Sequence, residues 1–173
     1  MKNGNTQVIP PHTIMGIKVI FLDIDGVLNT EEYLRKLKDP NQGYADPDKI
    51  SLIHSIISGT GAKIVISSNR RFDRKSVLQS LPTLRSDIIG STGLTGNRNS
   101  EIEDWVAKHD VQSFVVIDDM LLLFPDNLVQ TDPEVGLTAS DAGEAIRILN
   151  NDIDTVLRMA SVFKAMAYSN MLW

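Results

Sequence analysis

The residues with the clearest chemical potential in this chain are polar side chains that directly follow apolar runs. Two of these groups are acidic and one consists of small polar residues: Asp23 and Asp25, then Ser67, Ser68 and Asn69, then Asp118 and Asp119. Carboxylates gathered at one place repel one another unless a cation neutralises them, and hard oxygen ligands favour Mg²⁺. The pattern therefore predicts a Mg²⁺ site that an anionic substrate can share, with four candidate ligands: Asp23, Asp25, Asp118 and Asp119.

The apolar runs alternate with helical patterns, which predicts a three-layer α/β domain with a mostly parallel central sheet. Strands are predicted over 18–25, 62–67, 87–90, 113–118 and 127–131. Helices are predicted over 31–38, from Asp46 to Gly59, and over 73–81, 101–109 and 138–150. Because ligands bind beyond the carboxyl ends of parallel strands, the polar groups are expected to meet at one rim of the sheet.

Composition restricts the protein to one globular domain. The 173 residues are 42% hydrophobic, a length and composition that bury a core without disulfide or metal staples. Zero cysteines exclude thiol catalysis and Cys-ligated metal sites, and a net charge of -5 argues against a surface that binds nucleic acid all over. Without a signal-like or membrane-length apolar run, we expect a cytoplasmic protein with no membrane partner.

The domain boundaries follow from the same patterns. We expect a flexible N-terminal extension over 1–14 and a single catalytic domain over 15–150. Residues 151–173 have apolar positions at helical spacing, which fits a C-terminal helix docked on the domain or used in association. The sequence does not decide between these two roles, and it leaves the oligomeric state open.

Three motifs resemble those of the haloacid dehalogenase (HAD) superfamily. Residues 21–29, Phe-Leu-Asp-Ile-Asp-Gly-Val-Leu-Asn, resemble its motif I, Asp-x-Asp-x-Thr/Val. The run 64–67, which ends in Ser67, resembles motif II, and the run 115–119, which ends in Asp118 and Asp119, resembles motif IV in its double-Asp form. The resemblance covers about residues 17 to 150. It implies a Rossmann-like, HAD-type sandwich and a Mg²⁺-dependent phosphotransfer enzyme.

The resemblance also implies a role for each motif residue. Asp23 is expected to be the nucleophile that forms an aspartyl-phosphate, and Asp25 the general acid and base. Ser67 is expected to donate a hydrogen bond to a phosphoryl oxygen, Asp118 to hold Mg²⁺, and Asp119 to support it. The acid at position 25 favours a phosphatase over a dehalogenase.

The catalytic cation of motif III has two candidates. Arg98 lies near the start of the helix before the motif IV strand, where the family places a Lys or Arg, and Lys75 is the alternative. A basic cluster after motif II, made of Arg70, Arg71, Arg74 and Lys75, is predicted to contact a second phosphate or a nucleic-acid backbone. The predicted substrate-binding residues around this cluster are Ser68, Asn69, Arg70 and Arg71.

The chain leaves little room for a cap domain. Residues 30–46 hold at most one small helix, and ordinary α/β connections account for 72–112, so we expect a capless enzyme with an open site. Two blocks, 98–105 and 132–138, also resemble the HAD domain of multifunctional RNA-repair proteins. The candidate substrates are phosphorylated small molecules, nucleic-acid ends and phosphoproteins.

Two other kinds of protein fit part of the pattern. A response-regulator receiver is also a small parallel α/β domain, but its acidic pair follows the first strand, and the Asp118-Asp119 pair comes too late for it. A catalytically silent HAD-fold module that recognises a phosphorylated partner is the second alternative. Such a module is expected to have lost the nucleophile or the acid, yet this chain retains Asp23 and Asp25.

Overall fold

A five-stranded parallel sheet is the centre of the protein. The computed structural model describes residues 16–38 and 45–150. The strands are β1 (Ile17–Leu22), β2 (Lys63–Ile66), β3 (Ile88–Ser91), β4 (Val111–Asp118) and β5 (Leu128–Gln130), in the spatial order β3-β2-β1-β4-β5. All neighbouring pairs are parallel, which confirms the predicted α/β, Rossmann-like fold.

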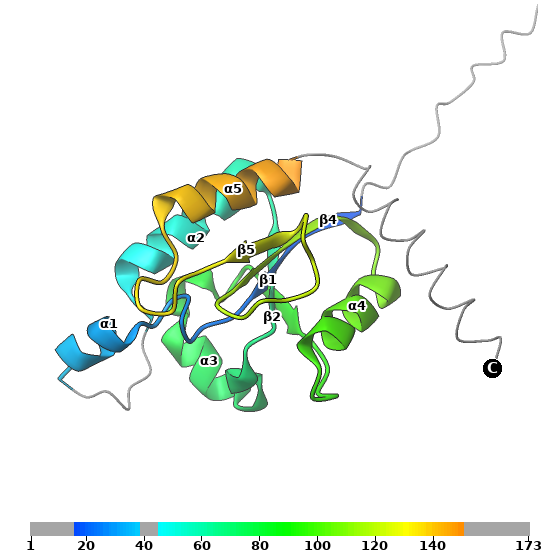
Figure 1. Ribbon diagram of the computed structural model, residues 1–173. Coiled ribbons are helices and arrows are strands. Elements are labelled where there is room, and N and C mark those ends of the chain that lie inside the picture. The colour runs from blue at the N-terminus through cyan, green and yellow to red at the C-terminus, as the bar shows by residue number, and fades with distance from the viewer. Residues whose placement is uncertain (1–15, 39–44, 151–173) are drawn as a thin grey trace, which may run out of the picture.

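The helices connect these strands across both faces of the sheet (Figure 1). They are α1 (Glu31–Lys36), α2 (Pro47–Thr60), α3 (Arg74–Ser80), α4 (Arg98–Lys108) and α5 (Ala139–Asn150), with short 3-10 turns η2 (Asn69–Phe72) and η3 (Pro82–Leu84). Helices α2 and α5 pack together on one face, and α4 covers the opposite face. The layers are therefore helix, sheet and helix.

Strand β1 shows why the sheet is buried on both sides. Ile20 and Leu22 belong to the core beneath α2 and α5, whereas Val19 and Phe21 belong to the core beneath α4. This alternation is the ordinary two-residue period of a strand, and both sets are apolar because helices cover both faces. A central strand buried in this way leaves polar residues only near its two ends, with Lys18 at the start and Asp23 after Leu22.

The local signals that begin or end helices α2 and α3 act as predicted. The Asp46 side chain accepts a hydrogen bond from the Asp48 N–H before Pro47, and Gly61, at φ 72°, ends α2 in the left-handed conformation. The Asp73 side chain caps α3 by accepting from the Ser76 N–H. Helix α4 differs from the prediction, because it begins at Arg98 rather than at 101.

The earlier start of α4 has a local cause. Asn97 is its N-cap, and the Asn97 side chain accepts a hydrogen bond from the Ser100 N–H. The helix therefore gains a turn that the apolar pattern, which begins at Ile102, does not signal. As a result Arg98 is a helical residue with a fixed backbone rather than a loop residue.

The described residues contain no inserted cap domain, and none of their helices is long and apolar enough to span a membrane. The predicted N-terminal extension over 1–14 and the predicted C-terminal helix over 151–173 lie outside the described residues. Within residues 16–38 and 45–150, the segments that follow the strands lie at the carboxyl rim of the sheet.

Candidate active site

The carboxyl ends of the three central strands bring the predicted catalytic residues together. Asp23 follows β1, Ser67 follows β2 and Asp118 ends β4, and these strands are neighbours. Backbone hydrogen bonds continue past the strand ends: the Asp23 N–H donates to the Ile117 carbonyl and the Ser67 N–H to the Leu22 carbonyl, both at 3.0 Å. All three polar side chains belong to buried residues. The sheet itself therefore fixes their positions.

Arg98 connects the two buried carboxylates. Its Nη1 donates to Oδ2 of Asp23 and to Oδ2 of Asp118, each at 2.5 Å, and its side chain is 7% exposed. Burial lowers the pKa of Arg98, but the charges of Asp23 and Asp118 outweigh burial and leave the pKa raised. Among the described residues, nothing accepts a hydrogen bond from Nε or Nη2. These two nitrogens are available to an anionic ligand.

The alternative cation of motif III, Lys75, lies elsewhere. It is exposed on α3 and lines a different hollow, together with Arg74 and Arg85. The geometry therefore places Arg98 rather than Lys75 beside the predicted nucleophile.

The carboxyl group of Asp118 is strongly affected by its surroundings. Burial first, and the charge of Asp23 second, raise the pKa of Asp118 from 3.8 to about 6, while the Met120 N–H and Arg98 act in the opposite direction. The Met120 N–H donates to Oδ1 of Asp118 at 2.9 Å. The single positive charge of Arg98 therefore does not neutralise both Asp23 and Asp118, and an excess of negative charge remains.

Asp119 joins the two buried aspartates in a group suited to a metal ion. One carboxylate oxygen from each of Asp23, Asp118 and Asp119 lies within 4.8 Å of the others. Three carboxylates and the Arg98 guanidinium together carry a charge of about −2, which one divalent cation neutralises. Because every donor is a hard oxygen, the residues fit Mg²⁺.

Gly26 provides the space in which Asp119 lies. A Cβ at position 26 would be 2.6 Å from Oδ2 of Asp119, and the φ of Gly26 is +74°. Both the backbone conformation and the contact therefore require glycine here. The Asp-x-Asp-Gly sequence is in this way tied to the acidic pair that ends β4.

The structure places Asp25 apart from this acidic group. The strand ends at Leu22, and the chain turns so that Asp25 is exposed at the rim. Nε of Arg70 donates to both carboxylate oxygens of Asp25, at 2.9 and 2.7 Å. The predicted strand over 18–25 therefore ends earlier, at Leu22, and the side chain of Asp25 is not among the grouped metal-ligand candidates of the described residues.

The predicted phosphate-binding residues after β2 differ in their surroundings. Ser67 is fully buried, and no described residue forms a hydrogen bond with its Oγ. The Ser68 Oγ caps η2 by accepting from the Arg70 N–H, and Asn69 is exposed at the start of this turn. A buried hydroxyl without a partner is costly, so Ser67 is the residue here that calls for a ligand.

Arg71 does not lie open to a substrate. Its side chain is 4% exposed, and Nη2 donates to Oε2 of the buried Glu101 at 2.5 Å. Nη1 donates to the carbonyls of Ser67 and Ser68, and Nε and Nη2 donate to the carbonyl of Gly93. Burial lowers the pKa of Arg71, and the charge of Glu101 counteracts this effect. Every nitrogen of this guanidinium is used inside the protein.

Glu101 is a residue of the site that sequence reasoning missed. Its Oε1 accepts from the N–H groups of Thr95 and Gly96, while its Oε2 accepts from Arg71. It thereby joins the loop after β3 to the turn after β2. A glutamate in the first turn of a helix is usually exposed, so no local signal reveals this burial.

The parallel sheet and the carboxylates, hydroxyl and cation at its carboxyl rim define an α/β domain of the haloacid dehalogenase type, a fold of hydrolases. Comparison with family models agrees: residues 19–142 match the model described as the HAD domain in Swiss Army Knife RNA repair proteins. The chain belongs to this family. No curated protein and no solved structure matched the chain.

Proposed function

We propose that the protein is a Mg²⁺-dependent phosphohydrolase that acts through an aspartyl-phosphate on Asp23. Its proposed substrate is a phosphomonoester, either a nucleotide or a polynucleotide end, from which it releases phosphate. The observation that carries this proposal is the contact of Arg98 with both Asp23 and Asp118, beside the unpartnered hydroxyl of Ser67. A buried cation with two unused nitrogens and a buried hydroxyl form a binding site for phosphoryl oxygens.

Asp23, Asp118 and Asp119 are the residues that would hold Mg²⁺. When bound, the ion neutralises charge on the phosphoryl oxygens and on the carboxylates. Arg98 binds a phosphoryl oxygen through its unused nitrogens while Nη1 stays with Asp23 and Asp118. The Ser67 Oγ donates to another phosphoryl oxygen, which satisfies the hydroxyl.

In the first step a carboxylate oxygen of Asp23 forms a bond to phosphorus, and the bond from phosphorus to the leaving oxygen breaks. Asp25 gives its proton to that oxygen. In the second step Asp25 takes a proton from water, which attacks phosphorus and releases phosphate and the Asp23 carboxylate. Arg70 pairs with Asp25 before substrate arrives. The entering phosphate competes for Arg70, which frees the Asp25 carboxyl group to face the leaving oxygen.

Two aspartate variants test the mechanism with an aryl phosphate in Mg²⁺. Asp23→Asn is expected to abolish turnover and the acid-stable phosphoenzyme, because the nucleophile is gone. Asp25→Asn is expected to release a burst of aryl product and then turn over about 100- to 10,000-fold more slowly, because an aryloxide leaves without an acid but water still needs a base. Rapid-quench product analysis measures both phases.

Metal-dependent turnover by Asp23→Asn would contradict the covalent mechanism. The absence of turnover and phosphoenzyme in the unchanged protein with Mg²⁺ would instead favour a silent module that only binds phosphorylated partners. EDTA provides the control for metal dependence, because it is expected to stop both steps without unfolding the sheet.

A further inference from the structure

We propose that the outer surface of η2 and α3 is a binding track for a single strand of nucleic acid. In this track Phe72 stacks on the base next to the phosphate that enters the site, and Arg74, Lys75 and Arg85 bind phosphates farther along the strand. The direction of the strand toward Asp23 rests on the proposed function. The track itself rests on three separate observations of shape, aromatic exposure and charge.

The first observation is a hollow that shares Arg98 with the candidate active site. It has a volume of about 420 Å³ and is lined by Asn69, Phe72, Leu94, Arg98 and Met120, among others. Arg98 is also the residue that contacts Asp23. A phosphate on Arg98 therefore has its attached sugar and base at this hollow, whose size falls in the range of small-ligand sites.

The second observation is the exposure of Phe72. Its side chain is 73% exposed, and Leu94 and Met120, which line the same hollow, are 54% and 51% exposed. The guanidinium carbon of Arg71 lies 5.8 Å from the centre of the Phe72 ring. Glu101 pairs with Arg71, so the cation beside the ring has a fixed position. An exposed aromatic ring beside a phosphate site is suited to stacking on a base.

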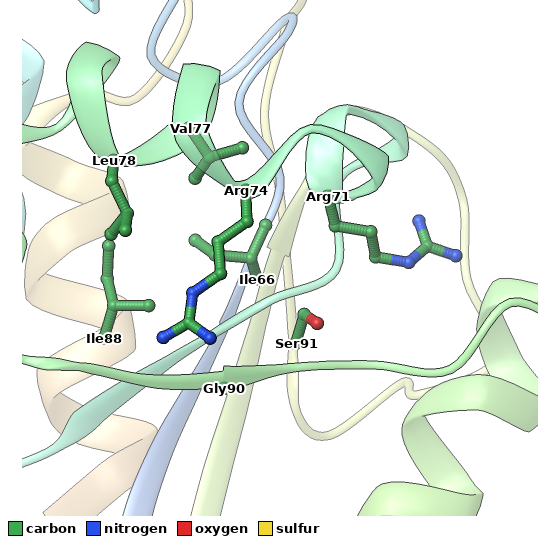
Figure 2. A pocket seen from close by; sticks show the side chains of 8 residues that line it. All are labelled: Ile66, Arg71, Arg74, Val77, Leu78, Ile88, Gly90 and Ser91. Carbon is green, nitrogen blue, oxygen red and sulfur yellow. The ribbon is translucent and has the colours of Figure 1, made fainter.

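The third observation is a series of three hollows along η2, α3 and β3, each of which shares a lining residue with the next. A smaller hollow of about 150 Å³ lies between α3 and β3 and shares Arg71 with the first one (Figure 2). Figure 2 shows Arg74 reaching from the start of α3 toward Gly90, beside Leu78. Arg74 and Leu78 also line the next hollow, of about 520 Å³, with Lys75 and Arg85. Shared residues thus join the three hollows.

Charge distinguishes this line from the rest of the surface. Arg74, Lys75 and Arg85 are exposed and form no ion pair within residues 16–38 and 45–150. The nearby acids are engaged, because Asp73 caps α3 and Asp87 pairs with Lys63. By contrast, Lys36, Lys108 and Arg147 are exposed and pair with an acid on their own helix, whereas the exposed Lys38 forms no ion pair with a described residue.

The combination of features favours a nucleic-acid strand over a phosphopeptide. A phosphopeptide presents one phosphate, which Arg98 and Ser67 already accommodate, and would leave three cations without a partner. A nucleic acid repeats phosphate and base along its length, so it uses the cations and the aromatic ring together. The free, unpaired end of a strand also suits an open site without a cap.

The test measures binding without turnover. Fluorescence anisotropy with the full chain in EDTA uses a labelled eight-nucleotide strand with a terminal phosphate, a mononucleotide competitor and a phosphoserine-peptide competitor. The triple variant Arg74→Ala, Lys75→Ala, Arg85→Ala is compared with Lys36→Ala, Lys108→Ala, Arg147→Ala, which also removes three exposed cations. Phe72→Ala is compared with Phe72→Trp, which keeps an aromatic face.

We expect the track triple variant to bind the strand more weakly and to lower the salt dependence of log Kd by about 2, at roughly 0.7 per phosphate contact, while the control triple variant keeps the original slope. Phe72→Ala is expected to weaken binding about 5- to 100-fold, with Phe72→Trp close to the unchanged protein. The mononucleotide is expected to compete much less effectively than the strand.

Three results would overturn the track: an unchanged salt slope in the track triple variant, unchanged binding in Phe72→Ala, or competition by the mononucleotide or the phosphopeptide equal to that of the strand. Because EDTA prevents turnover, these results are independent of the phosphoenzyme experiment. A protein that binds the strand as expected but forms no phosphoenzyme would keep the track and lose the proposed activity.

Discussion

Two buried arginines of this protein have opposite roles, although both contact buried carboxylates at the same rim. All the guanidinium nitrogens of Arg71 donate to Glu101 or to backbone carbonyls. Its charge is therefore balanced by Glu101, and all its donors are used. Arg98 uses Nη1 alone, for two carboxylates, and Asp119 adds a third negative charge nearby. From this comparison we infer that the group around Arg98, whose hydrogen bonds are incomplete, is the place for a ligand, whereas the group around Arg71 holds the structure.

The largest expected effect is on the stability of the fold, and it is expected at the buried pair of Arg71 and Glu101. Arg71→Met leaves the Glu101 charge buried without a cation and is expected to lower the free energy of unfolding by about 3–5 kcal/mol. Urea denaturation measures the loss. Adding Glu101→Gln to Arg71→Met is expected to restore part of it, because the buried charge is removed. A loss below about 1 kcal/mol in the single variant would show that this pair does not support the fold.

At Arg98, which lies among the carboxylates of the candidate active site, the expected effect is on catalysis. Arg98→Ala removes the cation beside Asp23 and is expected to lower kcat about 100- to 1,000-fold in saturating Mg²⁺. Arg98→Lys keeps the charge and is expected to lose less. Steady-state kinetics with an aryl phosphate measures both variants. If Arg98→Ala stayed within tenfold of the unchanged protein, the contrast between the two arginines would fail.

The third prediction concerns charge at Asp118 in the absence of metal. The pKa of Asp118 is about 6 in the folded protein, above the ordinary 3.8. The stability that protonation of Asp118 contributes is therefore fully present below about pH 4 and is lost as the pH rises through about 6. Asp118→Asn removes this cost and is expected to raise the free energy of unfolding in EDTA by about 1–3 kcal/mol at pH 7.5.

At pH 4 the gain from Asp118→Asn is expected to become small, because the unchanged protein is then protonated at Asp118. Denaturation curves at the two pH values provide the comparison. A variant equally or less stable than the unchanged protein at pH 7.5 would mean that Arg98 alone balances both carboxylates.

The smallest effect is expected at the exposed pair between Arg70 and Asp25. The two side chains are 35% and 52% exposed, so Arg70→Ala is expected to change the free energy of unfolding by less than about 1 kcal/mol. Loss of a cation that the phosphate can contact is expected to reduce kcat/KM about tenfold. Arg35→Ala, which breaks an exposed pair with Glu31, is the control and is expected to leave kcat/KM unchanged.

The sequence predicts the part of the site that the sheet determines. Asp23, Ser67 and Asp118 follow or end buried parallel strands, and strand ends of one parallel sheet meet by geometry. The pairing of Arg70 with Asp25 and of Arg71 with Glu101 could not be predicted in the same way. These side chains are 45 and 30 residues apart in the sequence and lie on irregular segments or a helix start, where no period fixes their direction.

The basic cluster after motif II also shows that side-chain positions on irregular segments cannot be predicted from the sequence. Adjacent arginines after motif II were predicted to bind substrate together, yet Arg70 is half-exposed at the rim and Arg71 is buried among carbonyls. Arg85, which lies farther along the chain than Arg70 and Arg71, lines the same hollow as Arg74 and Lys75 instead. The fold of η2, α3 and η3 decides which cations share a surface, and sequence proximity does not.

The hydrogen bonds of Glu101 to Thr95, Gly96 and Arg71 have a consequence for the entropy of substrate binding. Its two oxygens hold the Thr95 and Gly96 amides on one side and Arg71 on the other, so the loop beside Arg98 and the turn after β2 are ordered during folding. A site organised in this way loses little conformational freedom when a substrate arrives. The rim can therefore stay open to a long substrate and still present its groups in a fixed arrangement.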